Sequence, residues 1–458
     1  MNSDAVSAKQ EQLTFFQILR LLRDVRLWRI FVLGIASGYP WVIIGGTMTN
    51  WLRGEGISRT EIGFLGLIFL AYTFNFLWAP ILDAVKIRWL KGIGQRRSWI
   101  LLCQIGIVAF TLVLAFTDPH LMFELSPNLS IRVLVFIALG IAIFSATQDL
   151  AIDAYRVTII GHDEREMICL GSSMATAGWF CGAGFPGALL LYLSGAISWQ
   201  WVYVAAALLV LPVTILVLKW FEEPKLVSRE LPSNWFINVL SEYAETVVDF
   251  VKRHGGSIAV GLVLFCILFK IGEAFLGRMI DNFYVDIGYT QSEIATASRL
   301  VGTFVSIACA LFVGTVMPRI GVFRMLFGAG IAMAATNLIF AWIAGVGPNY
   351  DLLVFAVVAD GITEGVSNAA FVAFITFYVS HLHAASQYGA LASIGTGSRT
   401  ALAAMSGWFL DESLGGNYTL FFILTSVAVI PSLGLLGYLA YRVRGRGLRQ
   451  SELSQNVS

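Results

Sequence analysis

The sequence predicts an all-α membrane protein with twelve transmembrane helices, arranged as two bundles of six, with both termini in the cytoplasm. Three observations predict this fold class. Of the 458 residues, 57% are hydrophobic and only 13% are charged, whereas typical soluble domains have ~25% charged residues. The apolar residues form runs long enough to cross a bilayer, and Lys and Arg concentrate in alternate connections between these runs. Together these observations exclude a water-soluble protein.

The spans follow from the requirement for ~20 mostly apolar residues per membrane-crossing helix. Charged, glycine and proline interruptions give a first set of six at residues 30–51, 62–83, 98–116, 131–154, 167–193 and 200–219. A polar stretch follows, and then a second set at residues 257–279, 296–317, 321–344, 351–378, 388–408 and 418–440. The predicted domains are an interfacial N-terminal segment, a first bundle, a linker with an amphipathic helix, a second bundle and a tail, at residues 1–29, 30–219, 220–256, 257–440 and 441–458.

The orientation follows from the basic residues. With both termini inside, the predicted outside loops keep only Arg53 and Arg59, while clusters of Lys and Arg occupy the inside connections. Positive charge favours the cytoplasmic side of a membrane. The first apolar run also lacks a small-residue cleavage site, so we expect it to remain as the first span.

Charged residues inside the predicted spans are the candidates for function. A charge at mid-bilayer costs roughly 2.5 to 3.5 kcal/mol on insertion scales, so such residues usually face a cavity or a partner. Asp149 and Asp153 lie four apart, which places both carboxylates on one helical face. Two acids that share a face tend to have pKa values that split, so that one of them holds a proton near neutral pH. We therefore expect the proton-coupling acid to be among Glu273, Asp360, Asp149 and Asp153.

The candidate substrate-binding residues combine cations with aromatic and polar groups. Three cations in the second half suit the carboxylates of an anionic substrate, and the planar fork of arginine meets a carboxylate through two bonds. Aromatic rings in the first span can stack on a sugar. The expected set is Lys270, Arg299, Arg399, Tyr39, Trp41, Gln148 and Glu364. The alternative is a structural network of ion pairs, such as Lys270 with Glu273 and Arg399 with Asp360.

Three further charges are candidates for a cytoplasmic gate. The connection after the second span reads WAPILD, ending at Asp83, and then GQRR, ending at Arg97. This pattern resembles a variant of the loop signature of major facilitators, in which an acid and a basic cluster latch neighbouring helices together. The resemblance implies a latch between Asp83 and Arg97. Arg156, three residues after Asp153, is the third gate candidate. The alternative interpretation of the loop arginines is that their positive charge only sets the orientation of the protein in the membrane.

Several segments together resemble the muropeptide permease (AmpG) family of the major facilitator superfamily. They are residues 34–40 (GIASGYP), 76–83 (FLWAPILD), 145–149 (SATQD), 153–155 (DAY), 269–275 (FKIGEAF), 370–373 (AFVA) and 406–409 (SGWF). The resemblance covers nearly the whole chain. It implies the six-plus-six major facilitator fold, a location in the bacterial inner membrane, and proton-coupled import of anhydro-muropeptides, the turnover products of peptidoglycan.

Other functions remain open at this point. The same scaffold serves carriers of other solutes, such as acyl-coenzyme A or a drug. A membrane enzyme would need a nucleophile and base or a metal site, and the five histidines offer no such constellation, so we expect no enzyme, no metal and no cofactor. The expected partners are membrane lipid, protons and an amino-sugar peptide, without nucleic acid. We expect the chain to act as a monomer.

Overall fold

The chain is helical throughout the part that the structure describes, and no strand occurs there. The computed structural model describes residues 14–55, 66–87, 90, 92–117, 127–161, 163–223 and 235–455. The prediction of an all-α protein is confirmed for these residues.

The N-terminal half contains a short leading helix and a set of long helices and helical fragments. Its elements are α1 (Phe15–Leu21), α2 (Val25–Val42), the π-helix η1 (Ile43–Thr47), α3 (Met48–Gly54), the 3-10 turns η2 (Gly66–Phe69) and η3 (Asn75–Leu77), α5 (Leu70–Phe74), α6 (Ala79–Ala84), α7 (Gln95–Ala115), α9 (Pro127–Ile159), α10 (Arg165–Ser194) and α11 (Trp199–Lys219).

A linker helix, α12 (Trp235–His254), leads to the C-terminal half. The elements of that half are α13 (Gly256–Phe269), α14 (Ile271–Ile287), α15 (Gln291–Ile294), the π-helix η5 (Ala295–Gly302), α16 (Thr303–Ile320), α17 (Val322–Val346), α18 (Tyr350–Tyr378), α19 (Ala384–Trp408), the π-helix η6 (Phe409–Ser413), α20 (Tyr418–Val427) and α21 (Ile430–Gln455).

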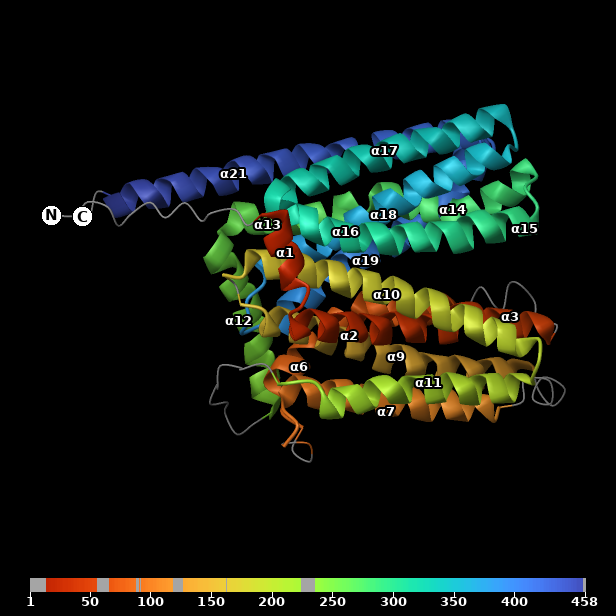
Figure 1. Ribbon diagram of the computed structural model, residues 1–458, viewed down its shortest axis with the longest axis horizontal. Coiled ribbons are helices and arrows are strands. Elements are labelled where there is room, and N and C mark those ends of the chain that lie inside the picture. The colour runs from red at the N-terminus through yellow and green to blue at the C-terminus, as the bar shows by residue number, and fades with distance from the viewer. Residues whose placement is uncertain are drawn as a thin grey trace.

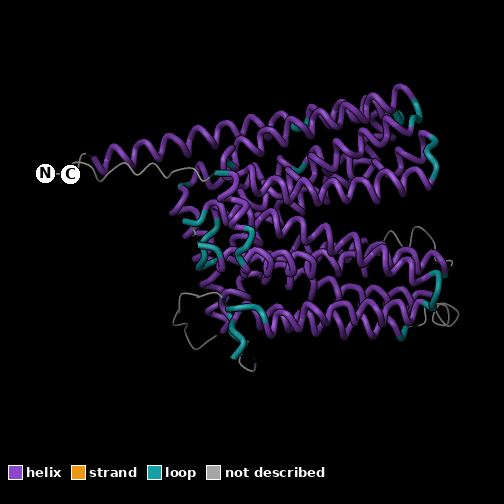
Figure 2. Tube along the Cα trace, viewed as in Figure 1, coloured by secondary structure: helices purple, strands orange, loops and turns teal. Residues whose placement is uncertain are grey.

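The two halves lie side by side with their long helices roughly aligned (Figure 1). Helix α10 of the N-terminal half packs along α16 of the C-terminal half. At one end, which we call the linker end, lie α1, α12 and the last turns of α21, and the tube view shows the connecting loops gathered at the two ends of the helices (Figure 2). Helix α12 contacts α6 from the first half and both α13 and α19 from the second.

Ten helical segments among the described residues are long and apolar enough to cross a membrane. The predicted spans at residues 62–83 and 388–408 are not among them. The first lies partly outside the described residues, and the remainder breaks into η2, α5, η3 and α6, where Pro80 sits in the first turn of α6. The second corresponds to α19, which is rich in Ala, Gly, Ser and Thr. The number of twelve spans stays a prediction.

Glycines bring α2 and α10 into backbone contact. A Cβ atom added to Gly38 would lie 2.2 Å from the carbonyl oxygen of Trp179, and one added to Gly182 would lie 2.2 Å from that of Ile35. Small residues allow membrane helices to approach this closely, and packing is the main attraction between helices in lipid. The glycines of the first and fifth predicted spans therefore hold the two helices together.

Candidate functional site

The first group of charged residues lies at a break in a membrane helix. Helix α13 ends at Phe269 and α14 begins at Ile271, because Lys270 has φ −87° and ψ 1° and interrupts the regular helix. Interrupted helices in transporters commonly form binding sites near the bilayer midplane. Glu273 lies in the first turn of α14, where the positive end of the helix dipole stabilises a carboxylate.

Two cations meet the carboxylate of Glu273. The Lys270 ammonium donates to Oε2 of Glu273 at 2.6 Å and to the amide oxygen of Asn368, on α18, at 2.6 Å. The guanidinium of Arg399, on α19, lies 3.2 Å from Oε1 of Glu273. The side chains of Lys270 and Glu273 are 7% and 13% exposed, whereas that of Arg399 is 47% exposed. We call Lys270, Glu273, Asn368 and Arg399 the Lys270 cluster.

Helix α18 adds two further acids to this region. Glu364, one turn before Asn368, accepts a hydrogen bond from the Ser306 hydroxyl of α16 at 3.1 Å. No described residue donates a hydrogen bond to Asp360, and the alternative pairing of Arg399 with Asp360 does not form, because Arg399 turns to Glu273. The side chain of Arg299 lies outside the described part of the structure, so its role in binding the substrate stays a prediction.

The polar residues of α9 contact α2 inside the N-terminal half. The Ser37 hydroxyl donates to Asp149 at 2.7 Å, and the Gln148 amide donates to the carbonyl oxygen of Ala36 at 2.9 Å. These two predicted site residues thus join two helices of the same bundle. No contact among the described residues brings Asp149 or Gln148 to the Lys270 cluster.

The two aromatic residues of the predicted substrate site differ in their surroundings. Tyr39 is buried, and its hydroxyl donates to the carbonyl oxygen of Ala206 on α11 at 2.6 Å, which directs it into the core of the N-terminal half. Trp41 remains partly accessible and packs against Phe69, Tyr72 and Trp179. Trp41 therefore retains a ring surface for a ligand, whereas the Tyr39 hydroxyl is already used.

Asp83 joins the two halves at the linker end. Its carboxylate accepts from the Ser386 hydroxyl at 2.6 Å and from the backbone amide of Ser386 at 2.8 Å, in the first turn of α19. It also pairs with Arg96 at 2.6 Å, and the two side chains are 2% and 3% exposed. An anion at a helix N-terminus is favoured by the free amides and the helix dipole. Asp83 thus binds α19 from the opposite half.

Arg97 does not reach Asp83, contrary to the latch predicted from the loop pattern. Its guanidinium donates to the carbonyl oxygens of Val217 and Leu218 at the end of α11. Successive residues at the start of α7 point in different directions, so Arg96 faces Asp83 while Arg97 caps the C-terminal turn of α11. Arg96 is the basic partner that the sequence interpretation missed.

Arg156 also connects the halves. It is 1% exposed, and its guanidinium donates to the Thr376 hydroxyl of α18 at 2.7 Å and to Asp153 at 3.0 Å. The guanidinium carbon lies 4.9 Å from the centre of the Tyr388 ring on α19, a cation–π arrangement. Arg156 therefore contacts both α18 and α19 from the N-terminal half.

Comparison with known proteins now identifies the family. Residues 30–400 match the Major Facilitator Superfamily. A putative transporter AmpG 1 of Rickettsia conorii is 30% identical, covering 91% of this chain and 98% of its own. The anhydromuropeptide permease of Escherichia coli K12 is 27% identical, covering 92% of this chain and 81% of its own. The chain belongs to the AmpG family of the Major Facilitator Superfamily.

Solved structures agree with the fold of this AmpG-family chain. The human organic anion transporter MFSD10 superposes with a TM-score of 0.65 at 15% identity, covering 92% of this chain and 99% of that one. The proton:xylose symporter XylE gives a TM-score of 0.65 at 9% identity, covering 90% and 94%. At these identities the likeness concerns the fold alone.

Several polar partners in this AmpG-family chain escaped the sequence interpretation. Asn368, Ser386, Thr376 and Ser37 are common residue types in polar-lined helices, and only the packing shows which charge each one contacts. Asn75 of η3 is another: its amide oxygen accepts from the Ser393 hydroxyl of α19 and so links the halves. Pro80, in the second predicted span, is the sequence feature that indicates a helix break close to Asn75, between η3 and α6.

Proposed function

We propose that this chain imports anhydro-muropeptides together with protons across the bacterial inner membrane into the cytoplasm. The observation that carries the proposal is the Lys270 cluster, in which two cations share a single carboxylate. The printed function of the Escherichia coli relative, an anhydromuropeptide permease, supports the choice of substrate. The fold supports alternating access between the two halves.

The charge count of the cluster suggests how proton and substrate are coupled. While Glu273 is ionised, its carboxylate is the ion-pair partner of both Lys270 and Arg399. When Glu273 accepts a proton, the two cations lose their partner and can hold the carboxylate of a substrate peptide instead. Proton binding then favours substrate binding, and by linkage substrate binding favours protonation to the same degree. Glu364 and Asp360 on α18 are the acids through which the proton can pass on.

The gate belongs to the linker end in this proposal. The basic connections gather at that end, and the positive-inside rule supports a cytoplasmic location for it. Asp83 and Arg156 tie the N-terminal half to α18 and α19, so the arrangement is closed toward the cytoplasm. Release of substrate requires both contacts to open, and entry takes place from the opposite end.

Uptake into proteoliposomes tests the proposal. Labelled anhydro-muropeptide is supplied outside vesicles that contain the purified chain, with the outside acid relative to the lumen. We expect accumulation above the outside concentration, and collapse of that accumulation when a protonophore is added. Uptake that does not depend on the pH gradient would contradict proton coupling. Gradient-driven uptake of acetyl-coenzyme A, without uptake of the muropeptide, would contradict the proposed substrate.

A further inference from the structure

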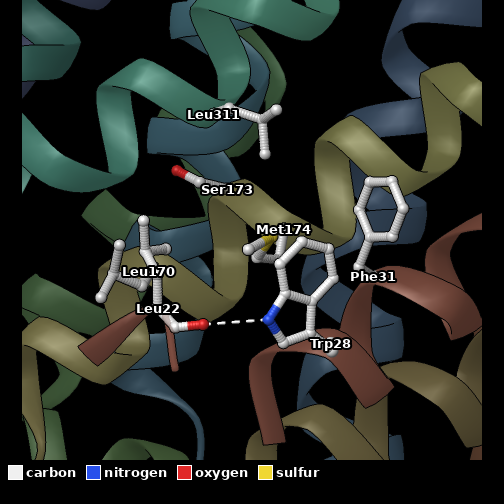
Figure 3. Close-up of a pocket in the computed structure, with 7 residues that line it drawn as sticks. All are labelled: Leu22, Trp28, Phe31, Leu170, Ser173, Met174 and Leu311. Atoms are coloured by element: carbon white, nitrogen blue, oxygen red, sulfur yellow. Dashed lines mark hydrogen bonds between the residues drawn. The ribbon is translucent and has the colours of Figure 1, made fainter. Parts of the chain in front are cut away.

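A pocket of about 330 Å³ lies near the linker end, at the seam between the two halves. Trp28 and Phe31 of α2 and Leu170 and Met174 of α10 form its walls on the N-terminal side, and Leu311 of α16 forms the wall on the other side (Figure 3). Leu22 closes one edge, where its carbonyl oxygen accepts from the Trp28 indole at 2.9 Å. The pocket therefore depends on both halves.

The lining suits a hydrocarbon chain. Six of the seven lining side chains are apolar, and the seventh is Ser173. Trp28 and Leu311 are 47% and 38% exposed on the outer surface, which in a membrane is the surface that faces lipid. A polar solute would gain few hydrogen bonds there, whereas an acyl chain buries apolar area on both sides.

Positive charge lies beside the same pocket. Arg20, in the last turn of α1, and Arg23, directly after Leu22, are exposed, and their guanidinium groups bond to no described residue. By contrast, Arg26 is held by Asp24 and Glu164 at 2.8 and 2.7 Å. Phe16 on α1 is 75% exposed, as expected for a helix that lies in the membrane interface. Free arginines at that depth attract anionic headgroups.

We infer that this pocket binds one acyl chain of an anionic phospholipid, with the headgroup phosphate at Arg20 and Arg23. The bound chain fills the space between α10 and α16 and stabilises the arrangement in which Leu311 faces Met174. A ligand shifts an equilibrium by its difference in affinity for the two states. Because the walls come from both halves, the lipid favours the state in which this seam is closed.

Photocrosslinking tests the inference on the full chain in nanodiscs. The probe is phosphatidylglycerol with a diazirine in the middle of one acyl chain, diluted in phosphatidylcholine. We expect crosslinks to concentrate on peptides that contain Trp28, Met174 and Leu311. Leu311→Trp fills the pocket and should lower labelling of Met174 several-fold, while the neighbouring Phe312→Trp, at a 61% exposed position outside the pocket, should not.

Charge variants separate a specific site from ordinary surrounding lipid. Arg20→Gln with Arg23→Gln should lower labelling by the anionic probe, while Lys252→Gln, an exposed cation on α12, should leave it unchanged. A phosphatidylcholine probe should label the pocket less. Even labelling over all lipid-facing helices, or equal labelling by both probes with no effect of the arginines, would overturn the inference. Variants are compared only at wild-type elution volume, and Leu311→Phe replaces Leu311→Trp if the latter misfolds.

Discussion

Glu273 has two cationic partners, and this separates the Lys270 cluster from a simple structural ion pair. A pair of one Lys and one Glu is neutral and complete, so it offers nothing to a substrate. In this structure Arg399 approaches the same carboxylate at 3.2 Å and keeps an exposed surface. The buried Lys270 also uses Asn368 as a second acceptor. Because one carboxylate lies between two cations, protonation of Glu273 would leave both cations available to an anionic ligand.

Asp83 pairs with Arg96 and not with the predicted Arg97, and this gives a prediction for single residues. Arg96→Gln leaves Asp83 buried without its charged partner, which costs about 3 to 5 kcal/mol when one member of a buried pair is removed. Arg97→Gln removes hydrogen bonds from a half-buried guanidinium to backbone carbonyls, and it leaves no buried charge without a partner. We therefore expect Arg96→Gln to lower the thermal unfolding midpoint in detergent much more than Arg97→Gln. Equal midpoints for the two variants would contradict the assignment.

Sequence reasoning could predict the residues of the site better than their pairings. Lys270 and Glu273 are three apart in one predicted span, a spacing at which side chains on a helix can meet, and they do so across the break at Lys270. Arg399 lies on a different helix, and its choice of Glu273 over Asp360 depends on the rotation of α19 against α14. Tyr39 shows the same limit: its place beside Pro40 was visible, but only packing shows that its hydroxyl binds Ala206.

At the scale of elements, the breaks in helices carry more information than their lengths. Lys270 separates α13 from α14, and η3 separates α5 from α6. One π-helical turn interrupts the first predicted span, and another forms the start of the eighth. π-Helical turns occur frequently at functional sites. Hydropathy identifies apolar runs and cannot show such breaks, and the second predicted span is accordingly divided into η2, α5, η3 and α6 in the described residues.

The contact between α2 and α10 predicts a strong effect of one methyl group. In Gly182→Ala the new Cβ would lie 2.2 Å from the carbonyl oxygen of Ile35, so the helices must move apart, at about 1 to 3 kcal/mol for overpacking. Gly46→Ala is the control, because its new Cβ would meet no atom of a packed neighbour within 4 Å. We expect only Gly182→Ala to lower the thermal unfolding midpoint; a shift of the same size in Gly46→Ala would argue against the close packing.

Linker helix α12 docks through a pair that depends on pH. The buried ring of His383, just before α19, hydrogen-bonds Glu242 of α12. Burial lowers the pKa of His383, but the hydrogen bond and charge of Glu242 outweigh burial, and Asp83 and Asp249 act in the same direction, so the pKa of His383 is raised. The pair therefore stabilises the fold fully below about pH 6.5 and loses this contribution as the pH rises through the folded-state pKa.

This linkage predicts the pH dependence of stability. Wild type should lose more of its thermal stability than His383→Gln when the pH rises from 6 to 9, so that the difference between them is largest at acid pH. Glu242→Gln should flatten the profile in the same way, because it removes the partner. Unfolding midpoints measured across this range in one detergent check the prediction, and profiles parallel to wild type in both variants would contradict it.

At the scale of the whole molecule, the two halves meet through different chemistry at different places. Charged and hydroxyl groups join the halves through Asp83, Arg156 and Asn75, and buried apolar residues of both halves pack into one cluster beside these contacts. The polar contacts can exchange one partner for another. Contacts of this kind suit a molecule whose halves rock against each other, and their pairing could not be predicted from sequence because the partners are far apart in the chain.

The pairing of Glu273 with two cations is the central claim, and Glu273→Gln tests it most directly. In one preparation of proteoliposomes, accumulation of anhydro-muropeptide under a pH gradient is compared with exchange of labelled for unlabelled substrate without a gradient. We predict that the variant keeps exchange, since Lys270 and Arg399 still bind the substrate, but loses gradient-driven accumulation. Glu293→Gln is the control and should behave as wild type, because this partly exposed acid of α15 bonds to Thr290 in its own turn. Accumulation in Glu273→Gln at the wild-type level would contradict the account.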